Sequence, residues 1–321
     1  MSVFDSTNAN TGYNANSMQR EGTKPLFQPA LNRYVLSVAK PRLGLSQFAQ
    51  KVKVPKGKGN IVTWDKCDPL PVSTEPLVEG VVPQGTQLSM KRVTAEVKQY
   101  GKYIATTDEF DYYKVDPSPE ALKIGERLAD NGAETFEALL RNAVGSFGHI
   151  QYAGGAESIE QANSKVITLE EIKKAVRWLK KNKAIKFNGK HFICALDPET
   201  SYDLQNDELW KNIKIHDPAD LYAGEIGELF GVRFIELTET EYEELRAMNQ
   251  SKNTDVHAVY VFGEESFGSV DPDDNIETIT HNKGEIGGPL DQFSTMGWKG
   301  KHVGKMLTPE WFVEINCGVS K

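Results

Sequence analysis

Residues 79–110 read EGVVPQGTQLSMKRVTAEVKQYGKYIATTDEF and indicate a long extended segment. From Val93 onward apolar and polar residues alternate, and the apolar set consists of Val93, Ala95 and Val97. Such alternation is typical of a strand that buries one face. The approach to this strand carries little apolar content and no catalytic or ligand motif. The pattern therefore indicates an extended arm whose apolar face packs on something else.

The residues around this strand extend the same pattern. The segment 51–66, KVKVPKGKGNIVTWDK, alternates like a strand on either side of a basic turn, and 67–83 is rich in proline, which predicts an irregular tip. We expect residues 51–107 to form one extended two-stranded excursion. Residues 1–30 are rich in Asn, Ser, Thr and Gly, so we expect them either to be flexible or to lie extended across a partner.

A long helix is predicted after the excursion, in DPSPEALKIGERLADNGAETFEALLRNAVGSF, residues 116–147. Ser118 is the expected N-cap and Pro119 the first helical residue. The apolar stripe recurs at multiples of four residues and consists of Ile124, Leu128, Phe136 and Leu140. We expect about 25 residues of helix. Close packing of another backbone would explain Gly125 and Gly132 inside it.

The remaining sequence mixes helices and strands. TLEEIKKAVRWLKKNKA begins with a capping box, Thr168 to Glu171, and predicts an amphipathic helix. HFICALDPET, VHAVYVFGEESFGSV and EWFVEINCGV predict buried strands. The order lacks the regular spacing of a doubly wound sheet, so the predicted fold class is α+β.

Composition excludes several classes of protein. The 321 residues carry a net charge of −8, which disfavours a protein built to bind DNA tightly. Three widely spaced cysteines are neither a disulfide framework nor a zinc pattern. We see no secretory signal and no apolar run long enough for a membrane helix, and expect an intracellular protein without membrane partners.

The sequence carries no complete metal-binding, catalytic, phosphate-binding or calcium-binding motif. The six histidines form no metal-binding or catalytic motif, so we expect each to be structural. GWKGKHVGKM (297–306) has Met306 where a phosphate-binding loop needs Ser or Thr, and DPDDNIETITHN (271–282) lacks the glycine and closing Glu of a calcium loop. The lysine-rich 180–190 reads as a solvated helix end rather than a nucleic-acid site. We expect no catalytic, cofactor-binding or metal-binding residues, and no enzyme.

The order of these pieces resembles the major capsid proteins of tailed bacteriophages, in particular the family typified by a podovirus with a virion-packaged RNA polymerase. Three segments carry the resemblance. They are PLVEGVVPQGTQLSMKRVTAEVKQYGKYIATTDE, GERLADNGAETFEALLRNAV, and the pair GEIGELFGVRFIELTE and GGPLDQFSTMGWKG. Their order and spacing cover about residues 51–314.

The resemblance implies a division of the chain into an N-arm (1–50), an E-loop (51–107), a P-domain spine helix (108–150), an A-domain (151–256) and C-terminal strands that complete both domains (257–321). It also implies an assembly interface on the E-loop. The residues expected there are Lys56, Lys58, Trp64, Glu79, Gln84, Met90, Lys91, Arg92, Lys98 and Tyr100. The spine helix is expected to pack through the apolar stripe Ile124, Leu128, Phe136 and Leu140.

The implied function is a structural protein that self-assembles into hexamers and pentamers of an icosahedral shell around phage double-stranded DNA. The expected location is the virion capsid, assembled in the host bacterial cytoplasm. Expected partners are other copies of the chain, with portal, scaffolding and decoration proteins, and packaged DNA in weak non-specific contact. We expect no Lys–Asn cross-link between subunits. The alternatives are an encapsulin-like compartment shell, a soluble enzyme and a nucleic-acid-binding protein that forms no shell.

Overall fold

The computed structural model describes residues 44–320 except 55–58, 68–69, 71, 75, 77–78, 81–84, 108–119, 146, 208–209, 211–224, 238–255, 272–275, 282–289 and 291. The chain divides into two compact units. Unit 1 comprises residues 1–47, 99–138 and 272–302, and unit 2 comprises residues 48–98, 139–271 and 303–321. No helix among the described residues is long and apolar enough to cross a membrane.

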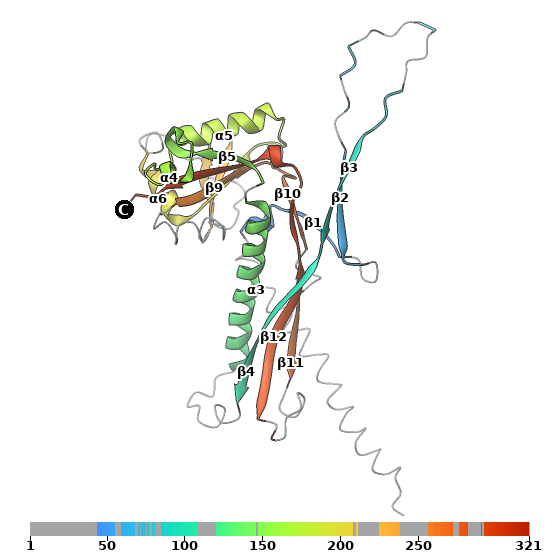
Figure 1. The fold of residues 1–321 in the computed structure, drawn as a ribbon, viewed down its shortest axis with the longest axis vertical. Coiled ribbons are helices and arrows are strands. Elements are labelled where there is room, and N and C mark those ends of the chain that lie inside the picture. Colours follow the sequence, from blue (N-terminus) through green and yellow to red (C-terminus); the bar gives the residue numbers. More distant parts are fainter. Residues whose placement is uncertain are drawn as a thin grey trace, which may run out of the picture. The chain divides into compact units, whose positions relative to one another are not determined.

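Unit 2 contains a six-stranded sheet (Figure 1) in the order β5-β14-β9-β6-β8-β7. The strands are β5 (His149–Tyr152), β6 (Phe192–Leu196), β7 (Glu225–Leu229), β8 (Val232–Glu236), β9 (Val256–Phe262) and β14 (Phe312–Gly318). The sheet is mixed, because β14 pairs parallel with β5 and antiparallel with β9. The predicted buried strands are confirmed, since every residue of β6 and of β14 is buried.

Helices cover this sheet. They are α4 (Ile159–Ala162), α5 (Leu169–Lys181) and α6 (Pro198–Asn206), with a 3-10 turn η3 (Ala153–Gly155). The apolar face of α5 packs into the core of the sheet through Ile172, Val176 and Leu179. The helix begins after Thr168 as predicted, but the Thr168 hydroxyl donates to the Glu171 carboxylate instead of accepting from a backbone N–H.

A second part of unit 2 is built from short strands and a hairpin. The strands β1 (Gln50–Val52), β10 (Phe267–Val270) and β13 (Gly304–Met306) form a three-stranded sheet in the order β1-β10-β13. The strands β2 (Ile61–Cys67) and β3 (Met90–Glu96) form an antiparallel hairpin in which Ile61 faces Glu96 and Cys67 faces Met90. Two short 3-10 turns are η2 (Leu45–Gln47), which belongs to unit 1, and η5 (Pro309–Trp311).

Unit 1 contains a three-stranded sheet and most of the long helix. The sheet order is β11-β12-β4, with β11 (Ile276–His281), β12 (Phe293–His302) and β4 (Lys98–Thr107). The helix α3 runs from Glu120 to Val144, which confirms the predicted length of about 25 residues. Residues up to Ala138 belong to unit 1 and the last turns to unit 2. The expected cap, Ser118 and Pro119, lies outside the described residues.

The sequence predicts that another backbone packs closely on Gly125 and Gly132 of the long helix. At Gly132 the structure shows a different neighbour. A Cβ on Gly132 would lie 3.5 Å from the indole ring of Trp298 on β12, an ordinary van der Waals distance, so this glycine faces an aromatic side chain rather than another backbone. The same indole packs edge-on against Phe136 with 5.5 Å between ring centroids. These contacts hold the helix against the sheet within unit 1.

The prediction of one excursion over residues 51–107 is wrong at both ends. At the start of this range, β1 pairs with β10 instead of with a strand of the hairpin. At the end of this range, β4 pairs with β12 in the sheet of unit 1 instead of with the hairpin. The hairpin proper is therefore β2 and β3. Alternation alone could not separate β3 from β4, because both strands alternate and only the chain's distant segments decide the partner of each.

Candidate assembly surfaces

The root of the hairpin packs on its own chain. Val62 and Trp64 are buried together with Val97 and Val270, and the indole N–H of Trp64 donates to the carbonyl of Gln50 at 3.3 Å. Trp64 is 4% exposed. The apolar area of Trp64 is thus already covered by residues of the same chain, which leaves little of it for a neighbouring subunit.

Most of the remaining hairpin residues are exposed. Met90 is 64% exposed, and Lys91 and Arg92 are exposed beside it. Arg92 forms an ion pair with Asp65 across the hairpin, with 2.6 Å between Nε and Oδ1. This hydrogen bond from the guanidinium lowers the pKa of the Asp65 carboxyl. The hairpin thus offers a surface that is charged on its flank and apolar at Met90 and at the exposed Ile61.

The other predicted interface residues are distributed differently. Glu79 is exposed in a turn beyond the hairpin strands. Lys98 is exposed and Tyr100 is partly buried, and both lie on β4 rather than on the hairpin. Lys56, Lys58 and Gln84 lie outside the described residues. Of the seven predicted positions that the structure describes, the three that lie together and exposed on one strand are Met90, Lys91 and Arg92.

One residue at the hairpin root was missed by sequence reasoning. The ammonium of Lys66 donates to the hydroxyl of Thr308 at 2.6 Å and lies 4.4 Å from the centre of the Trp311 ring. These contacts bind β2 to the segment that follows β13. No local pattern indicates these contacts, because Thr308 lies 242 positions from Lys66.

Unit 1 presents an apolar groove on its sheet, which the sequence also did not reveal. The groove has a volume of about 660 Å³. Tyr103 on β4 and Phe293 on β12 line it and are 71% and 52% exposed. Further lining residues are Lys102, Ala105, Ile279 and Trp298. Its apolar lining makes the groove a candidate interaction surface.

The predicted stripe of the long helix faces the interior. Leu128, Phe136 and Leu140 are buried and Ile124 is partly buried. Phe136 also stacks on the imidazole of His302, with 4.7 Å between ring centroids and 14° between planes. Burial lowers the pKa of His302 to about 4. The stripe is therefore packed within its own chain.

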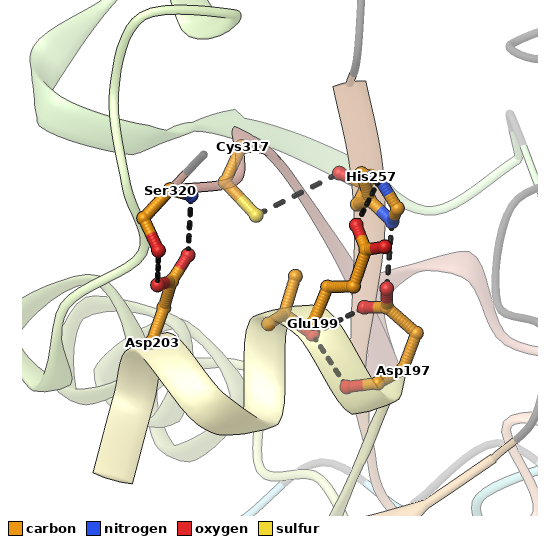
Figure 2. Close-up of polar contacts among 7 residues, drawn as sticks. Asp197, Glu199, Asp203, His257, Cys317 and Ser320 are labelled. Carbon is orange, nitrogen blue, oxygen red and sulfur yellow. Dashed lines mark hydrogen bonds and ion pairs between the residues drawn. The ribbon is translucent and has the colours of Figure 1, made fainter. Parts of the chain in front are cut away.

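A polar cluster lies where α6 meets β9 (Figure 2). His257 contacts two carboxylates, Asp197 at 2.6 Å from Nδ1 and Glu199 at 3.4 Å from Nε2. Asp197 is buried, which raises its pKa, but hydrogen bonds from His257 and from Thr200 outweigh the burial and the net pKa is lowered. One ligand atom from each of the three acidic or imidazole side chains lies within 4.8 Å of the others. The sequence did not single out this cluster, because His257 lies on β9 whereas Asp197 and Glu199 lie at the start of α6.

A neighbouring contact holds the end of the chain. Asp203 on α6 accepts a hydrogen bond from the backbone N–H of Ser320 at 2.8 Å and another from its hydroxyl. The thiol of Cys317 on β14 points to the carbonyl of His257 at 3.7 Å, and burial raises the pKa of this thiol well above its ordinary value. Cys317 is thus a packing residue rather than a nucleophile.

The architecture is similar to that of solved phage capsid proteins. The capsid of Ralstonia phage GP4 superimposes with a TM-score of 0.64 over 88% of this chain and 91% of that one, at 11% sequence identity. The capsid subunit of cyanophage Pam1 gives a TM-score of 0.58 over 82% and 86% of the two chains, at 14% identity. The chain has the phage capsid fold.

The same fold extends beyond phages. A virus-like particle from Pyrococcus furiosus gives a TM-score of 0.53 at 11% identity and covers 90% of this chain and 99% of that one. No protein-family model and no curated protein matches the sequence. The predicted α+β class and the capsid fold are therefore confirmed by structure, where three short sequence segments alone had carried the resemblance.

Proposed function

We propose that this protein is a major capsid protein, a structural subunit that assembles into hexamers and pentamers of an icosahedral shell around phage double-stranded DNA. The observation that carries the proposal is the phage capsid fold, which matches over more than four-fifths of this chain and of each capsid subunit compared. We further propose that the protein is not an enzyme, that its place is the virion capsid and that the shell forms in the host cytoplasm.

The exposed surfaces support assembly through self-contacts. A closed shell needs complementary patches repeated around each ring of subunits. The hairpin offers exposed apolar side chains at both ends of its ladder, Ile61 at one end and Met90 at the other, and unit 1 offers the groove at Tyr103 and Phe293. We propose that the hairpin of one subunit lies over this groove of its neighbour, with Lys91 and Arg92 at the edge of the contact.

The segments receive roles that follow from this arrangement. The β2–β3 hairpin acts as the E-loop, residues 1–50 as the N-arm, and the long helix within 108–150 as the P-domain spine. Residues 151–256 form the A-domain, and 257–321 supply strands to both domains. The six-stranded sheet of unit 2, with α5 packed on it, supports the A-domain assignment.

Further partners belong to the same proposal. A portal, a scaffolding protein and a decoration protein are expected partners of such a shell. Contact with packaged DNA is expected to be weak, because the chain carries a net charge of −8 and the lysines of α5 form only a local basic face.

Electron microscopy of the purified chain after size-exclusion chromatography tests the proposal. Icosahedral particles, rings or sheets of hexamers are the expected result. A chain that stays monomeric across concentration and salt, also when it is expressed with its phage's scaffolding protein, would overturn it.

A compartment shell is the second candidate, because the Pyrococcus particle subunit is covered over 99% of its length. The two differ in what the particle encloses. Nuclease-protected DNA inside particles isolated from infected cells supports the phage capsid, whereas a co-purified enzyme in place of DNA supports the compartment.

A further inference from the structure

The cluster at the junction of α6 and β9 brings three groups that can bind a metal ion close together. The imidazole of His257 lies between the carboxylates of Asp197 and Glu199, one at each ring nitrogen (Figure 2). The two contacts differ. Nδ1 lies 2.6 Å from Asp197 Oδ2, whereas Nε2 lies 3.4 Å from Glu199 Oε2.

The Asp197 side is a fixed hydrogen bond. Asp197 is buried and also accepts a hydrogen bond from the Thr200 hydroxyl, which holds its carboxylate in place. The short contact places a proton on Nδ1 and directs Nε2 outward. A carboxylate that accepts from one ring nitrogen while the other faces outward is the usual arrangement behind a metal-binding histidine.

The Glu199 side has the spacing of two ligands on one ion. A charge-assisted hydrogen bond from an imidazolium would be about 2.7–2.9 Å long. Two ligand atoms at about 2.0–2.2 Å from a tetrahedral ion lie about 3.4 Å apart. The observed 3.4 Å between Nε2 and Oε2 matches the second value.

We propose that His257 Nε2 and the Glu199 carboxylate bind a divalent cation of the zinc class, with Asp197 orienting the imidazole from the other side. An imidazole ligand favours zinc, copper, nickel or cobalt over calcium and magnesium, which take oxygen ligands. The Glu199 side chain is 63% exposed, so the remaining coordination positions are open to water or to a neighbouring chain. The cation joins α6 to β9 and does not depend on the proposed shell.

Equilibrium dialysis with Zn²⁺ tests the proposal on the full-length chain. A Cys67→Ser background removes the exposed thiol, whereas Cys194 and Cys317 are buried. The expected result is one zinc ion per chain that Glu199→Gln weakens by at least about 10-fold, since one of two protein ligands is lost. Glu310→Gln, at an exposed carboxylate on η5, is the matched control and is expected to leave zinc affinity unchanged.

Two further measurements separate a metal site from a simple imidazolium pair. Asp197→Asn is expected to weaken Zn²⁺ binding about 10- to 100-fold although it removes no ligand. Co²⁺ bound in place of Zn²⁺ is expected to give the intense visible absorption of a four-coordinate ion, absent in Glu199→Gln. Equal zinc binding by the parent and Glu199→Gln, no zinc retained by the parent, or equal displacement by Ca²⁺ would each overturn the proposal and leave an ion pair only.

Discussion

The imidazole of His302 stacks on the ring of Phe136 with 4.7 Å between centroids, and neither of its nitrogens has a hydrogen-bond partner among the described residues. Burial lowers its pKa from 6.5 to about 4. A buried imidazole without a partner is stable only in its neutral form. The packing of the long helix on β12 therefore includes a group that acid converts into an unfavourable charge.

Acid is expected to destabilise unit 1 through His302. The unfolded chain takes up the proton below pH 6.5 and the folded chain only near pH 4, so stability is lost as pH falls through this window. The free energy of unfolding is expected to be about 2 kcal/mol lower at pH 5 than at pH 7.5 from this group. Urea unfolding of the unassembled chain measures it, and His302→Phe is expected to remove this part of the pH dependence. The exposed His281→Gln should leave it intact, and an unchanged pH profile in His302→Phe would contradict the assignment.

Gly268 on β10 is expected to tolerate no side chain, because a Cβ there would lie 2.6 Å from Nε1 of Trp64. Gly268→Ala must displace the indole that anchors the hairpin, and overpacking of this kind costs about 1–3 kcal/mol. Thermal unfolding of the two variants measures it against Gly85→Ala, where an added Cβ meets nothing within 4 Å. Equal melting temperatures for the two variants would show that Trp64 can move freely.

Local patterns in the sequence predicted the elements but not their partners. The helix over 120–144 and the buried strands followed from apolar periodicity, which reports burial directly. The root of the hairpin did not follow, because Trp64 is buried by Val270 and Gly268 from a segment about 200 residues away. The His257 cluster was missed for the same reason, since Glu199 and His257 meet only once α6 lies beside β9.

Lys66 is expected to hold the hairpin in one orientation through Thr308 and Trp311. Lys66→Met keeps much of the apolar stem but removes the charged donor, and hydrogen bonds of this kind contribute about 1.5–3 kcal/mol. We expect faster hydrogen exchange in β2 and β3 with little change in the six-stranded sheet. Lys301→Met on β12 is the control. Exchange that rises equally in both variants would mean that Lys66 acts only through net charge.

The groove at Tyr103 and Phe293 is expected to decide assembly rather than folding. Both side chains are mostly exposed, so Tyr103→Glu should change the monomer's free energy of unfolding by less than about 1 kcal/mol. In a shell the same charge would be buried without a partner, which costs several kcal/mol per contact and should abolish particles. Light scattering and electron microscopy measure assembly, with Tyr202→Glu, an exposed tyrosine on α6, as the matched control. Particles formed by Tyr103→Glu at the parent's yield would place the neighbouring hairpin elsewhere.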